Sequence, residues 1–328
     1  MLKGVKKIDF FIPALLAAIV IAKLFPQLAV YEGIITLDMI SNIGVMMVFL
    51  FYGIKITPKR LKTDLGNWKL HLTVQLSTFF LFPLIVLPFT LIFKNHDSYL
   101  LWLGGFFLAT LPSTVSSSVV LVSVAKGNIP GAIFNASISS LLGVFITPLW
   151  MGIIITSGHG IDSAELLNII KNLVIQILSP VILGFFLNRF FGKWAERNTT
   201  PLKIFDQSVI LLVIYLSFAH SFSNNQFRLV AITDIILVVV FCLLLLFFVY
   251  RIITIICKLL KFNREDTITA QFSGSKKSLV HGTVMSTVIF AGMTGIGVIL
   301  LPLMIYHAMQ LMVIGAIAQK KAREVNEF

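Results

Sequence analysis

Two adjacent lysines in the middle of an apolar stretch are the residues of this chain that most clearly indicate a chemical role. Lys276 and Lys277 lie in the polar segment 273–282, too far from either end of that stretch for a long side chain to reach the membrane edge. A lysine at such a depth costs roughly 2.5–3.5 kcal/mol on insertion scales, and ionisable residues there normally serve function. We expect at least one of them to line a substrate or ion pathway or to hold an anion, while the other could pair with carbonyls of a broken helix.

A second polar segment, Leu111–Ser118, interrupts an apolar stretch in the first half of the chain. Pro112 lacks a backbone N–H and clashes with the preceding turn, so a helix is expected to stop there. The hydroxyl residues that follow can cap a restarted helix or line a gap with oxygen atoms. Packing between membrane helices also uses serine and threonine, but these residues are denser here than packing needs.

Other polar side chains lie on neighbouring apolar stretches. Asn135 and Ser139 are one helical turn apart, whereas Gln75 and His281 are isolated polar residues. Hydrogen bonding between helices explains such positions as well as a binding role does. The full set of candidate substrate- or ion-binding residues is Gln75, Thr114, Ser116, Ser117, Ser118, Asn135, Ser139, Ser273, Ser275, Lys276, Lys277 and His281.

The composition indicates what must position these residues. The chain has 328 residues, of which 57% are hydrophobic and 12% charged, and its mean hydropathy is +0.95. Soluble domains carry about 25% charged residues, and a spanning helix takes about 20 apolar residues. We therefore predict an all-α polytopic membrane protein with one membrane domain over 1–328 and ten transmembrane helices. The predicted spans are 10–26, 34–54, 68–93, 99–125, 129–156, 165–188, 204–222, 229–257, 265–291 and 295–319.

The net charge of +12 is explained by the placement of the basic residues. With these spans, twenty of the 26 lysines and arginines fall on one side, four fall on the other, and Lys276 and Lys277 lie within a span. Such a bias is the positive-inside signal, and it predicts that both termini are cytoplasmic in a plasma or inner membrane. It also removes the reason to invoke nucleic acid as a partner. The lipid bilayer is the expected surrounding.

The two halves of the chain share an order of span lengths, prolines and polar breaks. Pro13 in the first span corresponds to Pro180 in the sixth, and segment 111–118 corresponds to segment 273–282. Each half, about 1–160 and 161–328, contains five predicted spans, so the second enters the membrane from the opposite side. This predicts an inverted repeat with two discontinuous helices that cross near the midplane. Their half-helix N-termini favour anions.

The sequence lacks the residues that several other activities require. No predicted span has a carboxylate near its middle, which a sodium–proton exchanger of similar layout would be expected to use. The chain has no Walker motif for ATP, and no nucleophile–base pairing suggests a hydrolase. Cys242 and Cys257 form no metal or disulfide motif. We therefore expect a protein that is not an enzyme and has no cofactor other than, at most, a sodium ion.

At its polar segments the chain resembles the bile acid:sodium symporter superfamily over essentially its whole length. The closer resemblance is to the divergent subgroup that contains the seventh member of the vertebrate solute carrier family 10. It implies a panel domain of spans 1, 2, 6 and 7, a core domain of spans 3–5 and 8–10, and crossing helices in spans 4 and 9. The segments that carry it are Leu111-Pro112 to Ser118, Ala125-Lys126-Gly127-Asn128, Phe134-Asn135-Ala136, Thr147-Pro148 and Gly274-Ser275-Lys276-Lys277-Ser278-Leu279.

The resemblance also implies a sodium site from which this chain departs. Better-known members bind two sodium ions with hydroxyls on spans four and five and with a glutamate and a glutamine on span nine. Here Ser117 and Ser118 match the first group, and Asn135 could add a ligand. The span-five hydroxyl positions fall on Ala132 and Ala136, the glutamate falls at or beside Phe272, and the glutamine falls at or beside Lys276. A lysine ammonium could therefore stand where an ion stood, and sodium coupling is left open.

Together these features predict a secondary active transporter that moves a small organic anion by alternating access. In this interpretation Lys276 or Lys277 attracts the anion or replaces the coupling ion. The alternative is a non-transporting or regulatory membrane protein linked to calcium homeostasis, which the subgroup resemblance suggests. The sequence names neither the substrate nor the oligomeric state.

Overall fold

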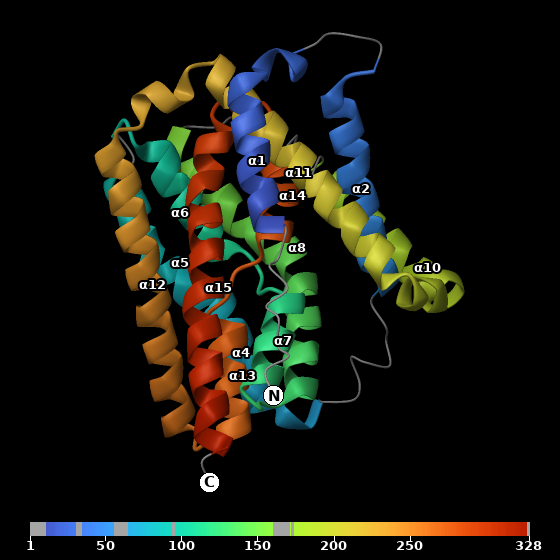
Figure 1. Ribbon diagram of the computed structural model, residues 1–328, viewed down its shortest axis with the longest axis vertical. Helices are drawn as coiled ribbons and strands as arrows, with labels where there is room; N and C mark the ends of the chain where they lie inside the picture. The colour runs from blue at the N-terminus through green and yellow to red at the C-terminus, as the bar shows by residue number, and fades with distance from the viewer. Residues whose placement is uncertain are drawn as a thin grey trace.

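The computed structural model describes residues 11–30, 35–55, 65–93, 96–159, 171 and 174–326, and these form helices joined by short connections (Figure 1). The principal helices are α1 (Phe11–Leu24), α2 (Leu37–Lys55), α4 (Trp68–Leu76), α5 (Phe82–Ile92), α6 (Tyr99–Thr110), α7 (Ser116–Val124), α8 (Ile129–His159), α10 (Ser179–Arg197), α11 (Thr199–Ser223), α12 (Ile232–Leu259), α13 (Arg264–Gly274), α14 (Leu279–Ile289) and α15 (Ile296–Asn326). Short helical turns are η1 (Pro26–Leu28), η2 (Leu65–Asn67), η3 (Ser77–Leu81), η4 (Val174–Leu178) and η5 (Gln226–Leu229).

Seven helical segments in the described part of the chain are long and apolar enough to cross a membrane. They include the continuous run α4–η3–α5 and the run η4–α10. The other three predicted spans are represented by α1, which has 14 described residues, and by the two interrupted pairs α6–α7 and α13–α14. The chain is therefore an all-helical polytopic membrane protein, while the count of ten spans stays a prediction.

The helices pack in two groups that meet along α11. Helices α1, α2, α10 and α11 pack mainly on one another, and α2 and α10 lie together at the right-hand edge of the view (Figure 1). The second group is built around α15, which contacts α6, α7, α12 and α14 and runs through the centre of the view. Helix α11 contacts both α14 and α15 and so joins the groups.

Both helix interruptions fall in the polar segments that the sequence marks. Helix α6 ends at Thr110, Leu111 adopts an extended conformation with ψ of 152°, and α7 begins at Ser116. This is the expected effect of Pro112, which cannot donate the hydrogen bond that would continue the helix. Helix α13 ends at Gly274, and α14 restarts at Leu279 with Ser278 as its N-cap. The side chain of Ser278 accepts the His281 backbone N–H, which supplies one partner that a helix N-terminus lacks.

The first group of helices depends on a close approach between two glycines. A Cβ added at Gly53 of α2 would collide with the Val181 carbonyl oxygen of α10 and come within 3.0 Å of the Gly184 Cα. A Cβ added at Gly184 would meet the Leu50 carbonyl oxygen in the same way. Small residues let the backbones of membrane helices pack this closely, so neither position can take a side chain without separating α2 from α10.

Replacing Gly53 or Gly184 with alanine should therefore lower the stability of the protein by about 1–3 kcal/mol, the usual cost of overpacking. The measurement is the melting temperature of the purified protein in detergent. Gly315→Ala in α15 is the matched control, because a Cβ at that position meets nothing within 4 Å. Equal melting temperatures for Gly53→Ala and Gly315→Ala would contradict the close approach.

Candidate functional site

The two interrupted helices touch each other at their breaks. The Ser278 backbone N–H donates to the Pro112 carbonyl oxygen at 2.9 Å. The Ser113 hydroxyl donates to the Ser273 carbonyl oxygen at 2.6 Å. These bonds join segments more than 150 residues apart in the chain, and they place both polar segments in a single buried cluster.

Lys277 is the centre of that cluster. Its side chain is fully buried, and its ammonium donates to three backbone carbonyl oxygens, those of Thr78 at 2.6 Å, Ala109 at 2.6 Å and Leu111 at 2.8 Å. The same ammonium lies 4.2 Å from the centre of the Phe82 ring, whose face attracts a cation. An ammonium has three N–H donors, so these three carbonyls use all of them.

The break in the first interrupted helix leaves two of these carbonyls free. In a continuous helix the Ala109 oxygen would accept the Ser113 N–H, but that N–H donates instead to the Ser139 hydroxyl at 2.9 Å. The extended backbone of Leu111 turns its carbonyl out of the helix. Because these carbonyls lie at the C-terminal end of α6, they carry the negative end of its dipole, which favours a cation.

A π-turn in the long helix α4–η3–α5 frees the third carbonyl. At the end of η3 the Phe82 N–H donates to the Ser77 oxygen, five residues back, instead of to Thr78. Pro83 follows and has no N–H to offer. Thr78 is therefore left with an unused acceptor that the Lys277 ammonium takes, and π-turns of this kind are frequent at functional sites.

Side chains of α15 satisfy the backbone of the second break. The Gln310 amide accepts the Lys277 N–H and donates to the Lys277 oxygen, both at 2.8 Å. The Tyr306 hydroxyl donates to the Ser275 carbonyl oxygen at 2.7 Å. Irregular backbone at membrane depth needs such partners. The sequence analysis missed Gln310, whose only signal is an amide in the middle of a predicted span.

Lys276 has a different set of neighbours. It is fully buried, and its ammonium donates to the Ser117 hydroxyl at 2.6 Å in the first turn of α7. The Ser117 hydroxyl donates to the Thr114 hydroxyl at 2.9 Å, and the Thr114 and Ser118 hydroxyls are 2.7 Å apart. A chain of hydroxyl groups therefore runs from Lys276 along the start of α7. Ser116 lies in the same turn, but its side chain is outside the part that the structure describes.

Four further candidates also lie in the cluster. The Ser139 hydroxyl receives the Ser113 N–H, as described above, and the Ser275 hydroxyl donates to the Gln271 carbonyl oxygen. The Ser273 hydroxyl is buried without a hydrogen-bond partner, although the Ser273 carbonyl accepts from Ser113. His281 lies 2.9 Å from the Ser278 hydroxyl and packs edge-on against Tyr52 of α2.

Gln75 and Asn135 form a separate pair. The Gln75 amide donates to the Asn135 carbonyl oxygen at 3.1 Å and to its side-chain oxygen at 3.2 Å. The Asn135 amide group donates to the Gly131 oxygen at 2.9 Å and lies 3.0 Å from the His71 ring nitrogen. None of these bonds involves Ser117 or Ser118, and a sodium site made of Ser117, Ser118 and Asn135 stays a prediction.

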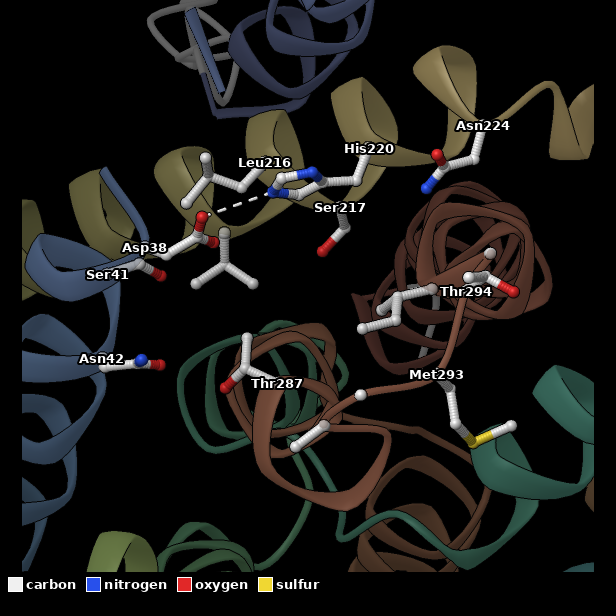
Figure 2. Close-up of a pocket in the computed structure, with 15 residues that line it drawn as sticks. Asp38, Ser41, Asn42, Leu216, Ser217, His220, Asn224, Thr287, Met293 and Thr294 are labelled. Atoms are coloured by element: carbon white, nitrogen blue, oxygen red, sulfur yellow. Dashed lines mark ion pairs between the residues drawn. The ribbon is translucent and has the colours of Figure 1, made fainter. Parts of the chain in front are cut away.

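A cavity of about 370 Å³ lies at the other end of α14 (Figure 2). It is bounded by the start of α2, the end of α11 and the loop that joins α14 to α15. Hydroxyl and amide groups dominate its polar lining, together with one carboxylate and one imidazole. The polar lining residues are Asp38, Ser41, Asn42, Ser217, His220, Asn224, Thr287 and Thr294.

Asp38 and His220 lie side by side in the lining of this cavity (Figure 2). The His220 Nε2 atom lies 3.4 Å from the Asp38 Oδ2 atom, and both side chains are partly exposed. Asp38 is in the first turn of α2 and His220 is in the last turn of α11, so each lies at the helix end whose dipole favours its charge. Sequence reasoning missed the pair because the two residues are 182 positions apart and each lies at the end of a span.

Known proteins resemble the chain over nearly its full length. The model of the SBF-like CPA transporter family matches residues 9–323. An uncharacterized protein of Pseudomonas aeruginosa is 36% identical, covering 96% of this chain and 93% of that protein. Putative symporter YfeH of Escherichia coli (strain K12) is 32% identical, covering 98% and 95%. Sodium/bile acid cotransporter 7 of Rattus norvegicus is 31% identical, covering 95% and 92%.

The family model covers the two interrupted helices, the lysine cluster and the cavity. The names of the family and of the Escherichia coli and Rattus norvegicus relatives describe transporters and not enzymes. The expected membership of the bile acid:sodium symporter group is thus confirmed, and the chain belongs to the SBF-like CPA transporter family.

Proposed function

We propose that this protein is a secondary active transporter of a small organic anion, in which Lys277 permanently replaces the coupling cation. The observation that carries the proposal is the buried Lys277 ammonium held by three backbone carbonyls at 2.6–2.8 Å. Carbonyl oxygens arranged in this way substitute for the hydration shell of a bare cation in ion-selective proteins. The ammonium occupies such a site as a cation that is covalently tethered and cannot dissociate.

In this proposal the two lysines have different roles. All three donors of Lys277 are used by carbonyls, so it has none to offer to a substrate. Lys276 instead touches a hydroxyl group at the N-terminus of α7, where the helix dipole and the free N–H groups also favour an anion. Lys276 is therefore the residue that we assign to attracting the organic anion.

The packing of the helices supports alternating access. We assign α1, α2, α10 and α11 to the panel domain, and the remaining principal helices to the core domain. Tyr52 of α2 reaches across the boundary: its hydroxyl donates to the Ser137 carbonyl oxygen at 3.3 Å, and its ring packs on His281. Together with the packing of α11 on α14 and α15, these are the contacts that would change when one domain moves against the other, which is the motion that inverted-repeat transporters use.

The same proposal includes the topology. Interruptions at corresponding places in the two halves support the inverted repeat of 1–160 and 161–328 with ten spans. The bias of the basic residues supports cytoplasmic termini. A lipid bilayer and a small solute are then the partners that the protein requires.

Removing the Lys277 side chain should create a requirement for an external cation. Lys277→Ala leaves three buried carbonyls without donors, and the variant should lose at least about 2 kcal/mol of stability. Methylammonium or sodium chloride should restore part of its melting temperature, because the vacated site can accept a free cation. The measurement is the melting temperature with each chloride salt against choline chloride.

Two variants act as controls for that experiment. Lys276→Ala removes a neighbouring buried lysine that is bonded to a hydroxyl, so methylammonium should not stabilise it. Lys277→Met fills the space with an apolar chain and should be destabilised without being rescued. The proposal is wrong if Lys277→Ala is as stable as the natural protein and indifferent to every cation.

The role of Lys276 is tested by transport. Among lactate, succinate and taurocholate, the anion that most raises the melting temperature serves as the substrate for uptake into proteoliposomes. Lys276→Met keeps the length of the side chain but removes its charge, and uptake should fall at least tenfold, equivalent to about 1.4 kcal/mol. Lys276→Arg should not restore uptake fully, since a planar guanidinium does not match a point-charge site.

Lys320→Met, which changes an exposed lysine near the end of α15, should leave uptake unchanged. Normal uptake by Lys276→Met would exclude Lys276 from the pathway. A well-folded natural protein that transports none of the three anions would count against the organic-anion proposal itself.

A further inference from the structure

The cavity between α2, α11 and the α14–α15 loop has a charge that depends on a single proton. Asp38 and His220 are the two titratable side chains among its lining residues. With a neutral imidazole the pair carries one negative charge, and with an imidazolium it carries none. Histidine is the side chain that proteins ordinarily use to change charge near neutral pH.

We propose that this cavity is the entry chamber for the transported anion, and that the Asp38–His220 pair takes up one proton with each anion. The inference rests on the proposed function and adds its coupling ion. With the imidazole neutral, the Asp38 carboxylate repels an anion. Once His220 is protonated that repulsion is compensated, and the imidazolium can donate a hydrogen bond to the incoming anion.

The position of the pair suits proton exchange with the surroundings. The Asp38 and His220 side chains retain 52% and 40% of their accessible surface, so a proton reaches them without any opening of the structure. The last turn of α11 favours the imidazolium, and the first turn of α2 favours the carboxylate. Elements that contact α11 and α15 carry further charged or titratable side chains that do not line the cavity; these are Lys23 of α1, Arg228 of η5 and Asp234 of α12, with His96 and Asp97 in the connection before α6.

Helix α14 connects the chamber to the lysine cluster. Thr287 lines the cavity, and Thr283 lies one turn deeper on the same face of the helix. The Thr283 hydroxyl is buried and has no hydrogen-bond partner. Ser278 and the two lysines lie at the other end of α14, which has 11 residues and is therefore about 16 Å long. A hydroxyl group is thus available between the chamber and Lys276.

Lys277 explains why a proton would be needed. If the carbonyl site is permanently filled by the ammonium, no sodium ion enters there with the anion. Accumulation of an anion against a membrane potential that is negative inside then requires another cation. The pair in the chamber can supply one by binding a proton from the same side as the substrate.

The test measures anion binding and proton uptake together. Lactate, succinate and taurocholate are titrated into the purified full-length protein by calorimetry at pH 6 and pH 8, in two buffers of different ionisation enthalpy. The natural protein should bind at least one of these probes with about one proton taken up at pH 8, and its Kd should be at least about tenfold weaker at pH 8 than at pH 6.

Variants of the pair should change this behaviour in opposite directions. His220→Gln keeps the carboxylate but cannot take up a proton, so binding should be weak at both pH values. Asp38→Asn removes the repelling charge, so binding should be tight at both. His96→Gln changes a histidine outside the cavity lining and should behave like the natural protein.

The outcomes separate this inference from the proposed function. A Kd that is independent of pH, or a pH dependence that survives in His220→Gln, would overturn the proton site while leaving anion transport intact. Failure of all three probes to bind the folded protein at either pH would count against both the chamber and the organic-anion proposal. Opposite shifts in the two variants would support the pair as the proton site.

Discussion

The structure depends on one interaction, the bond network between the Lys277 ammonium and three backbone carbonyls. A charged amine buried inside a membrane protein is tolerated only when its donors are satisfied. Here each acceptor exists because a helix departs from regular geometry. Pro112 ends α6 and frees Ala109 and Leu111, while the π-turn before Pro83 frees Thr78. Burying the ammonium alone, or the three carbonyls without donors, would cost free energy. The hydrogen bonds between them offset both costs.

The rest of the cluster follows from the need to satisfy the backbone at the two breaks. The Pro112 carbonyl receives the Ser278 N–H, the Ser273 carbonyl receives the Ser113 hydroxyl, and Gln310 bonds both backbone groups of Lys277. The first two of these bonds join opposite halves of the chain, so the two interrupted helices are held together at their breaks by reciprocal bonds. Helix α14 then extends from this fixed point to the cavity, where α2 and α11 contribute the opposite wall. A movement of α2 and α11 relative to α14 would therefore change the cavity.

Much of this arrangement could be predicted from the sequence, because the signals were local. Proline and clustered hydroxyls showed where the first helix must break, and buried lysines with flanking serines and glycine showed the second break. What the sequence could not show was which distant group completes each bond. Thr78 and Lys277 are 199 positions apart, and the π-turn that frees the Thr78 carbonyl lies in an ordinary apolar run. The pairing of Asn135 with Gln75 and His71 was hidden for the same reason, as was the meeting of Asp38 with His220. The local sequence predicts which backbone groups lose their helical hydrogen bonds. Which distant residues then bond to those groups is decided by the packing of the helices.

The most direct test of the central claim is the sodium dependence of the natural protein. Its melting temperature should be compared in sodium chloride, potassium chloride and choline chloride at equal ionic strength. If the Lys277 ammonium occupies the cation site, the three salts should give the same melting temperature. An ion that fills a native site a hundredfold above its Kd adds about 2.7 kcal/mol of stability. A sodium-specific increase of that size would show that a free ion binds, and that Lys277 does not replace it.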